Sequence, residues 1–220
     1  MTNDRDAVIA TASSSPLADQ PATPSLFVGP WYAWWPGDPL PALPALPDFA
    51  VAPTADDHAL ASLSGSDAAT PDVRRRAGNQ PYLATLAGDS VAYGWSASAT
   101  VEIGELGLTF ALPPGDRYLW DFATLPAWRG RGIYPHLLQA ILRHGAASQA
   151  RHWIGHEPDN VASARGILKA GFRLVGNVYR LPAGDFILIP TGPRERARLG
   201  AALLGAILAP SPTTPVTPTA

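Results

Sequence analysis

The clearest pattern of hydrophobic and polar positions lies between residues 118 and 142. Residues Tyr118–Thr124 are aromatic or apolar, which is typical of a buried strand, and Pro126 ends that strand because it has no backbone donor. From Ile133 onward, apolar residues recur at helical spacing. A glycine-containing stretch separates the two patterns. The sequence therefore predicts a strand, a tight turn and a helix.

The residues before this unit alternate in polarity. Residues 80–87 and 90–103 read as an antiparallel pair joined by a Gly-Asp turn, and the second run alternates strictly from Val91 to Ile103. The alternation changes phase after Gly104, which predicts a bulge near Gly104–Glu105. A first strand at residues 49–52 and two short helices should precede the pair. One of these helices carries three consecutive arginines, which we interpret as a solvated face.

The residues after the unit predict a strand at 151–157, a helix from Asn160 to Gly171 and a hairpin over residues 172–189. A further helix should cover residues 194–208. We expect three regions: a largely disordered, Pro/Ala-rich leader with an aromatic segment (1–46), one folded domain (47–190), and a C-terminal helix with a disordered Pro/Thr tail (191–220).

The composition excludes several classes of protein. The formal net charge of −2 gives no field for nucleic acid, and the absence of cysteine excludes disulfides and thiolate sites. The N-terminus carries charges and lacks a long apolar core, so it does not resemble a secretory signal. The long apolar run at Leu199–Ala209 is about 11 residues, too short to span a bilayer. We expect a cytoplasmic protein with no nucleic-acid, membrane or metal partner, and self-assembly is left open.

The predicted turn has the properties of an anion site. A helix that starts there presents unpaired N–H groups at the positive end of its dipole, and Arg129 and Arg131 add charge at the same place. Pyrophosphate would suit such a site. The turn is not a P-loop, because no Gly-Lys-Ser/Thr follows it, and it is not the GxGxxG fingerprint of dinucleotide-binding folds.

Two segments resemble the GNAT N-acetyltransferase family. Residues 129–134 (RGRGIY) are similar to its motif A, which is Arg or Gln, two residues, Gly, one residue, then Gly or Ala; Tyr134 stands in the last, small position. Residues 160–172 resemble the helix after the family's fifth strand, which starts near an Asn and ends at a Gly-Phe. The resemblance implies an α/β (α+β) fold: a mixed, mostly antiparallel central sheet with helices on both faces. Strands that splay apart beside the motif helix would leave a cleft.

The resemblance also implies a cosubstrate site for acetyl-CoA. Backbone groups of the turn would bind the pyrophosphate, the end of the preceding strand would bind the pantetheine arm and polarise the thioester carbonyl, and an asparagine would hydrogen-bond the same arm. An amine would then attack the thioester directly, without a cysteine or a metal. The cofactor-binding residues implied are Phe122, Ala123, Thr124, Arg129, Gly130, Arg131, Gly132, Ile133, Tyr134 and Asn160.

The catalytic acid and base are less clear, because the chain departs from the family here. Many relatives place a Tyr seven residues after the Asn, where this chain has Ile167. The candidate catalytic residues are Asp121, Glu105, His156 and Tyr118. Each has a structural alternative: a paired carboxylate for Asp121, a solvated residue for Glu105, a structural histidine, and aromatic packing for Tyr118. Tyr134 could also protonate the thiolate, and a water-relayed path without a dedicated base is open too.

The leading hypothesis from the sequence is an acetyl-CoA-dependent N-acyltransferase acting on a primary amine. The alternatives are a catalytically inactive acyl-CoA-binding module, motivated by Ile167, and a partner-binding protein that uses its aromatic segment and C-terminal helix.

Overall fold

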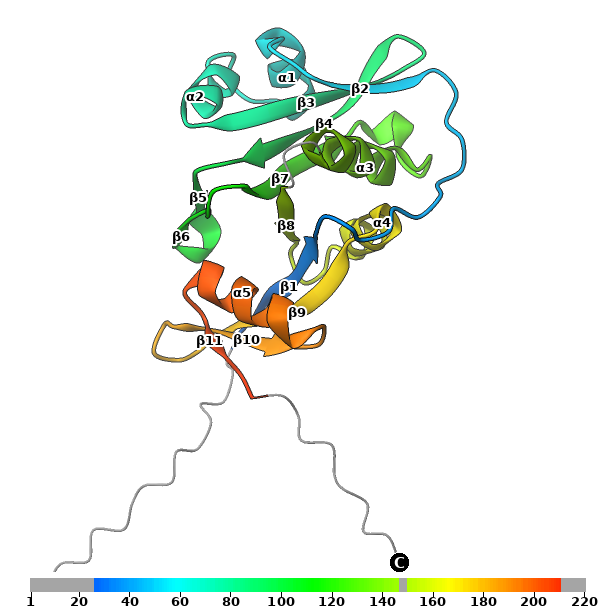
Figure 1. Cartoon of the computed structure of the whole chain (residues 1–220). Helices are drawn as coiled ribbons and strands as arrows, with labels where there is room; N and C mark the ends of the chain where they lie inside the picture. Colours follow the sequence, from blue (N-terminus) through cyan, green and yellow to red (C-terminus); the bar gives the residue numbers. More distant parts are fainter. Residues whose placement is uncertain (1–25, 147–149, 211–220) are drawn as a thin grey trace, which may run out of the picture.

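A central sheet organises the molecule (Figure 1). The computed structural model describes residues 26–146 and 150–210, and within these ranges a nine-stranded sheet has the order β11-β10-β9-β1-β8-β7-β4-β3-β2, with β5 and β6 as a separate pair. In this described part β7–β8 and β10–β11 run parallel, and the other neighbours are antiparallel. The strands are β1 (Leu26–Trp34), β2 (Phe49–Pro53), β3 (Asn79–Leu86), β4 (Asp89–Ala97), β5 (Thr100–Ile103), β6 (Leu108–Ala111), β7 (Asp116–Thr124), β8 (Arg151–Gly155), β9 (Arg173–Arg180), β10 (Phe186–Pro190) and β11 (Ile207–Leu208).

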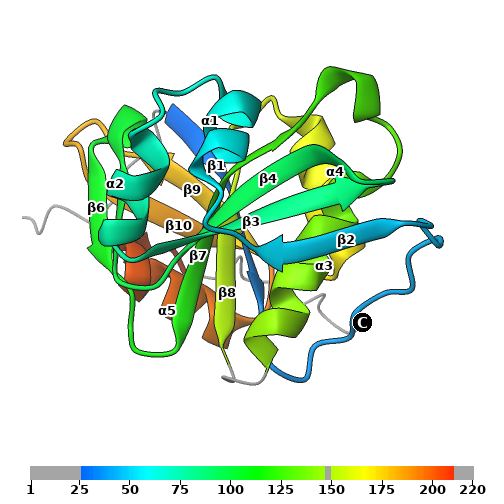
Figure 2. The ribbon, with the colours of Figure 1, turned by 90° about the horizontal axis from the view of Figure 1, so that it is seen from above.

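Helices cover both faces of the sheet, as the resemblance implied. The helices are α1 (Asp57–Ser64), α2 (Thr70–Arg76), α3 (Ile133–Ala146), α4 (Val161–Ala170) and α5 (Arg194–Leu204), with short 3-10 turns at Gly104–Leu106 and Pro126–Trp128. The apolar sides of α3 and α4 pack with Leu119 and Ile154 in one core. The other face carries α5 against Trp153 and α1 against Trp95. Figure 2 shows β2, β3 and β4 side by side at one end of the sheet.

The N-terminal region differs most from the prediction. Residues 26–34, which fell inside the expected disordered leader, form β1, and this strand lies between β8 and β9 within the sheet. Trp31, Tyr32, Ala33 and Trp34 are all buried, with alternate side chains on opposite faces. The prediction was wrong for these residues because the pairing partners lie far along the chain, where a local pattern does not reveal them. Residues 1–25 and the predicted tail at 211–220 lie outside the described residues.

A proline-rich segment, residues 35–48, connects β1 to β2 along the outside of α3 and α4 (Figure 1). The Gln139 side chain donates to the carbonyl of Pro41 at 2.8 Å, which fixes the segment to α3. At its start, Asp38 accepts two hydrogen bonds from Arg196 of α5, at 2.6 and 2.7 Å. Burial by itself would raise the pKa of Asp38, but the hydrogen bonds from Arg196 and Trp35 and the charge of Arg173 outweigh it and lower that pKa.

Most other predicted elements are present. Asn160 caps α4 by accepting from the backbone of Ser163, and Gly171 ends it in the left-handed conformation with φ 103°. The expected strand over 90–103 is instead divided, because the chain leaves β4 at Ser98 and forms the separate β5–β6 hairpin. The phase change near Gly104 is the 3-10 turn of that hairpin and not a bulge.

Candidate functional site

The two parallel strands beside α3 separate and leave a backbone edge open. β7 and β8 pair only from Asp116–Leu119 against Arg151–Ile154. β8 ends at Gly155 whereas β7 continues to Thr124, so residues 120–124 have no strand on that side within the described sheet. Their other edge is paired with β4. An extended ligand could therefore add to the free edge as a strand does.

A bulge lies in the same stretch of β7. Trp95 faces Trp120 and Tyr93 faces Ala123, so two residues, Asp121 and Phe122, oppose one residue of β4. Asp121 adopts φ 49°, a conformation that is uncommon for residues other than Gly but that Asn and Asp adopt more readily than most. The residue opposite must be glycine, since a Cβ on Gly94 would lie 2.0 Å from the Phe122 ring.

The bulge sets the orientation of Asp121. Strict alternation along β7 would put its side chain on the face opposite to Trp120, yet the guanidinium of Arg74 both pairs with the Asp121 carboxylate and lies 4.7 Å from the centre of the Trp120 ring. The Tyr93 hydroxyl also donates to Asp121, at 3.1 Å. The carboxylate therefore has two donors. The structure matches the alternative given for this residue, a paired structural carboxylate.

Arg74 also corrects the interpretation of the arginine run. Its side chain, 27% exposed, lies over the rings of both Trp95 and Trp120 instead of projecting into solvent. Arg75 pairs with Asp57 of α1, and only Arg76 of this run is mostly exposed. Arg74 thus forms part of the wall of a cleft, a position that no local pattern in the sequence indicates.

A cleft of about 1530 Å³ follows the open edge of β7. It passes between the end of β8 and the turn before α3 and reaches the β5–β6 hairpin on the other face of the sheet. Residues Phe122–Thr124 line it along the free strand edge. β1 supplies residues 28–31 of its wall, although the sequence placed this region outside the folded domain. The cleft is large enough for a cosubstrate together with an acceptor.

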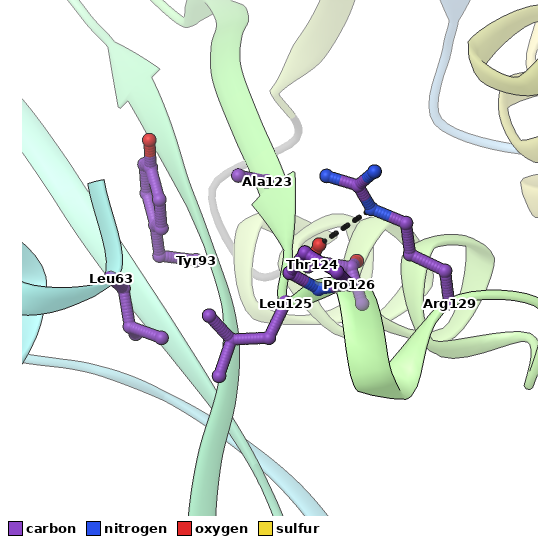
Figure 3. A pocket seen from close by; sticks show the side chains of 7 residues that line it. All are labelled: Leu63, Tyr93, Ala123, Thr124, Leu125, Pro126 and Arg129. Atoms are coloured by element: carbon purple, nitrogen blue, oxygen red, sulfur yellow. Dashed lines mark hydrogen bonds between the residues drawn. The ribbon is translucent and has the colours of Figure 1, made fainter. Parts of the chain in front are cut away.

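The glycine turn lies at one end of this cleft. Gly130 and Gly132 have φ 78° and 79°, which confirms that the turn needs glycine at both positions. The Nε of Arg129 donates to the carbonyl of Thr124 at 3.0 Å and thereby ties the turn to the end of β7 (Figure 3). Arg129, Gly130, Gly132, Ile133 and Tyr134 all line the cleft. Because α3 begins at Ile133, the N–H groups of this turn lie at the positive end of the helix.

Arg131 is the one predicted cofactor residue that does not line the cleft. Its guanidinium lies 4.8 Å from the centre of the Trp128 ring. A separate hollow of about 70 Å³ beside the turn, lined by Leu63, Tyr93 and Leu125 among others, has room for a few water molecules (Figure 3). It is too small for a cosubstrate.

Tyr134 occupies the position where the family has a small residue, and α4 is shaped to receive it. A Cβ at Gly166 would lie 2.3 Å from the Tyr134 ring, so a glycine is required there. The Tyr134 hydroxyl is 3.3 Å from the hydroxyl of Ser163. Burial raises the pKa of Tyr134 to about 12, against a lowering effect of the Ser163 hydrogen bond. Ile167 is fully buried, so α4 offers no hydroxyl at that position.

Asn160 lines the cleft at the start of α4, where its Oδ1 accepts from Ser163 N at 2.9 Å. Its side-chain N–H donors remain for a ligand. Arg165 and Lys169, on the same helix, also line the cleft. Sequence reasoning missed these two cations because nothing in the helix pattern distinguished them from a solvated face.

The remaining catalytic candidates lie at different places along the cleft, with Tyr118 and Glu105 toward the β5–β6 hairpin and His156 between β8 and α4. The ring of Tyr118 stacks on Trp31 at 5.4 Å, and burial, together with the negative charge of Glu105, raises the pKa of Tyr118 well above its usual value. Glu105 lies exposed in the turn between β5 and β6. His156 follows β8, with Nε2 3.2 Å from the Tyr32 hydroxyl and Nδ1 2.7 Å from the carbonyl of Glu157. Tyr118, Glu105, Asp121 and His156 all line the cleft.

Comparison with known proteins agrees with this geometry. Residues 66–172 match the family model described as the acetyltransferase (GNAT) family. The chain carries a GNAT acetyltransferase domain. The matched GNAT segment contains β7, the glycine turn, α3, β8 and α4, which supply most of the cleft. No curated protein sequence matches the chain.

Several solved structures are similar to this chain. A GNAT-family protein from Novosphingobium aromaticivorans shares 20% identity, with a TM-score of 0.47 over 73% of this chain and 66% of that one. A GCN5-related N-acetyltransferase from Kribbella flavida shares 19% identity, with a TM-score of 0.44 over 67% of this chain and 54% of that one. An aminoglycoside acetyltransferase in complex with coenzyme A and kanamycin shares 21% identity, with a TM-score of 0.49 over 62% of this chain and 90% of that one. The chain thus spans about two thirds of the first of these proteins and about half of the second.

Two negative findings apply to residues 26–146 and 150–210. No group of three or more histidine, aspartate or glutamate side chains in these ranges is arranged to hold a metal ion. No helix there is both long and apolar enough to cross a membrane.

Proposed function

We propose that this GNAT domain transfers an acetyl group from acetyl-CoA to a primary amine. The observation that carries the proposal is that one cleft joins three features: the glycine turn at the start of α3, the open edge of β7, and a partly aromatic pocket on the far side of the sheet. An anion site, a strand edge and an acceptor pocket, in that order, fit a long cosubstrate with phosphate at one end and a thioester at the other.

The cosubstrate would bind through main-chain groups. The N–H groups of Gly130, Gly132 and Ile133 would receive the pyrophosphate, with charge from Arg129. The pantetheine arm would lie along Phe122–Thr124 and hydrogen-bond to the free edge. The same edge would supply an N–H to polarise the thioester carbonyl. The side-chain N–H of Asn160 and the cations of α4 would contact the cosubstrate from the other side.

In the chemical step the amine nitrogen bonds to the thioester carbon, the carbon–sulfur bond breaks, and coenzyme A leaves as a thiolate that takes up a proton. Tyr118 is our candidate for that proton, because it lines the cleft and its hydroxyl carries a proton at neutral pH. The amine must lose a proton, which His156 would accept, directly or through water. Asp121 is a weaker candidate base because Arg74 and Tyr93 already occupy its carboxylate.

The first experiment measures ligand binding. Thermal melts and calorimetry with acetyl-CoA, coenzyme A, ATP and NAD should show stabilisation by the two CoA compounds alone. Gly132→Trp should abolish it, because the indole would fill the anion site. Gly88→Trp is the matched control: Gly88 has φ 92°, also lies in open space, and belongs to the β3–β4 turn away from the cleft. Equal loss of binding in both variants, or no binding of CoA to the wild type, would refute the proposed site.

The second experiment measures turnover. Release of free thiol from acetyl-CoA is followed with a panel of primary amines. Tyr118→Phe should lower kcat by about 10²-fold and leave the affinity for CoA unchanged. An unchanged kcat would exclude Tyr118 as the proton donor. CoA binding without turnover of any amine would favour the alternative of an inactive acyl-CoA-binding module, for which the buried Ile167 is the structural argument.

A further inference from the structure

Most of the charges that line the cleft are separated across the sheet; Glu157, between β8 and α4, is a carboxylate on the otherwise cationic side. Arg129, Arg165 and Lys169 lie at the end formed by the turn and α4. Glu102 and Glu105 lie on the β5–β6 hairpin, on the side of α5. Among the described residues neither glutamate forms an ion pair. The hairpin end therefore presents uncompensated negative charge to whatever occupies that part of the cleft.

The cations near the hairpin do not neutralise these glutamates. Arg74 reaches this part of the cleft, but its guanidinium is paired with Asp121 and lies over two indole rings. The pair contributes no net charge. A ligand at the hairpin thus meets the carboxylates of Glu102 and Glu105 beside the aromatic rings of Trp120 and Tyr118.

A second observation points to a ligand at the same place. Tyr118 is 7% exposed and lines the cleft, and its hydroxyl has no hydrogen-bond partner among the described residues. Its ring is held by stacking on Trp31 and by an edge contact with Phe110 at 5.7 Å between ring centres. The hydroxyl is not among the fully buried unpaired polar atoms, so it is open to the cleft and can hydrogen-bond to a group bound there. Burial, and after it the negative charge of Glu105, raises the pKa of Tyr118.

The reacting amine itself cannot be the group that the glutamates serve. It must be neutral when it attacks the thioester, and a carboxylate beside it would favour its protonated form. A permanent positive charge elsewhere on the acceptor has no such conflict. Such a charge would be attracted by the two unpaired carboxylates. The apolar part of the acceptor, between its two nitrogen groups, would pack against the aromatic side chains of the cleft wall.

We propose that the acceptor is an amine with a second, cationic group, which Glu102 and Glu105 bind while its apolar body lies against Trp120 and Tyr118. This inference rests on the proposed acyl transfer, because it specifies the acceptor of that reaction. It commits to a cation distal to the reacting nitrogen and to a flat or apolar segment between the two.

Three benzylamines that differ only at the para position test the inference. One carries a trimethylammoniomethyl group, one its uncharged carbon isostere 2,2-dimethylpropyl, and one a carboxymethyl group. Each has a single reactive amine. We expect kcat/KM for the cationic compound to exceed that of its neutral isostere by about tenfold, and the anionic compound to be the poorest. The preference should shrink as ionic strength rises.

Variants identify the residues responsible. Glu102→Gln combined with Glu105→Gln should remove the preference for the cation and leave kcat/KM of the neutral isostere within about twofold. A catalytic-base role for Glu105 would instead lower all three rates together, which would overturn its assignment as a recognition residue. Glu195→Gln, an exposed change on α5 outside the cleft, is the charge-matched control and should retain the preference.

Binding is measured in parallel, so that the inference can be decided apart from catalysis. The three amines are titrated calorimetrically into protein with and without coenzyme A. A cation that binds more tightly than its isostere, and loses that advantage in the double variant, supports the inference even if coenzyme A does not bind and the proposed function fails. Equal affinities for the cation and its isostere, or a preference that survives in the double variant, would overturn it.

Discussion

His152 should make the stability of the protein fall as the solution becomes acidic. This residue lies on β8 and is 1% exposed, with its ring against Trp34 of β1 at 5.9 Å between centres. Its Nδ1 lies 3.1 Å from the carbonyl of Ala150. Burial, with a smaller contribution from the charge of Arg117, lowers the pKa of His152 from 6.5 to about 4. The imidazole therefore remains neutral in the folded protein at pH values where the unfolded chain would bind a proton.

The sign and size of the effect follow from linkage. Below pH 6.5 the histidine is protonated in the unfolded chain, whereas in the folded protein it stays neutral down to about pH 4. The free energy of unfolding therefore decreases as the pH is lowered through this range. With these two pKa values the loss between pH 7 and pH 5 is about 2 kcal/mol, and it levels off below the pKa of the folded state.

Urea unfolding of the wild type and of His152→Asn at pH 7 and pH 5 tests this reasoning. Asparagine keeps a donor that can reach the Ala150 carbonyl, but it does not titrate. Between pH 7 and pH 5 the variant should therefore lose about 2 kcal/mol less unfolding free energy than the wild type does, whatever its stability at pH 7. His136→Asn, a partly exposed histidine on α3, is the control and should keep it. If wild type and His152→Asn lose the same free energy between the two pH values, the buried neutral histidine is not the cause.

Three further substitutions have defined outcomes. Asp38→Ala leaves the guanidinium of Arg196, 10% exposed, without its carboxylate, and should cost about 3 kcal/mol in the free energy of unfolding, whereas a cost below about 1 would show that the pair is dispensable. Gly166→Ala places a methyl group against the Tyr134 ring and should lower the free energy of unfolding by about 1–3 kcal/mol. In a Tyr134→Ala background the same substitution should instead stabilise α4, because alanine favours the helix more than glycine does, and thermal melts that show no such reversal of sign would contradict the contact. Asp121→Asn keeps a residue that tolerates φ 49° and should cost about 1 kcal/mol, less than Asp121→Ala, which also strains the backbone; equal chemical-denaturation midpoints for the two would argue against strain at the bulge.

Much of the candidate site could be predicted because its parts are local. The turn requires glycine at 130 and 132, the apolar spacing defines α3, and Asn160 and Gly171 delimit α4 through interactions within a few residues. Such features depend on backbone conformation and on neighbours along the chain, which the sequence shows directly. The family model covers the same segment.

Catalytic and recognition residues were harder to assign because their environment comes from distant segments. The bulge in β7 turns Asp121 toward Arg74, a residue 47 positions away, and no local pattern indicates the extra residue in the strand. Gly166 is explained only by the Tyr134 ring that lies over it. The structure brings Tyr118, Glu105 and His156 to the wall of one cleft, which their separate places in the sequence do not indicate.

The sequence by itself determined the strand–turn–helix unit, the caps of α4 and the β9–β10 hairpin, since each is fixed by the spacing of apolar residues and by glycine, proline and asparagine at particular positions. The tertiary structure alone decided the place of β1 and thereby one wall of the cleft. The strand enters between β8 and β9, where Tyr32 meets His156, 124 residues away. Its alternating aromatic residues pack into the cores on the two faces of the sheet only when strands from the other end of the chain pair with it on both sides. Such long-range pairing leaves no periodic signal in the segment itself.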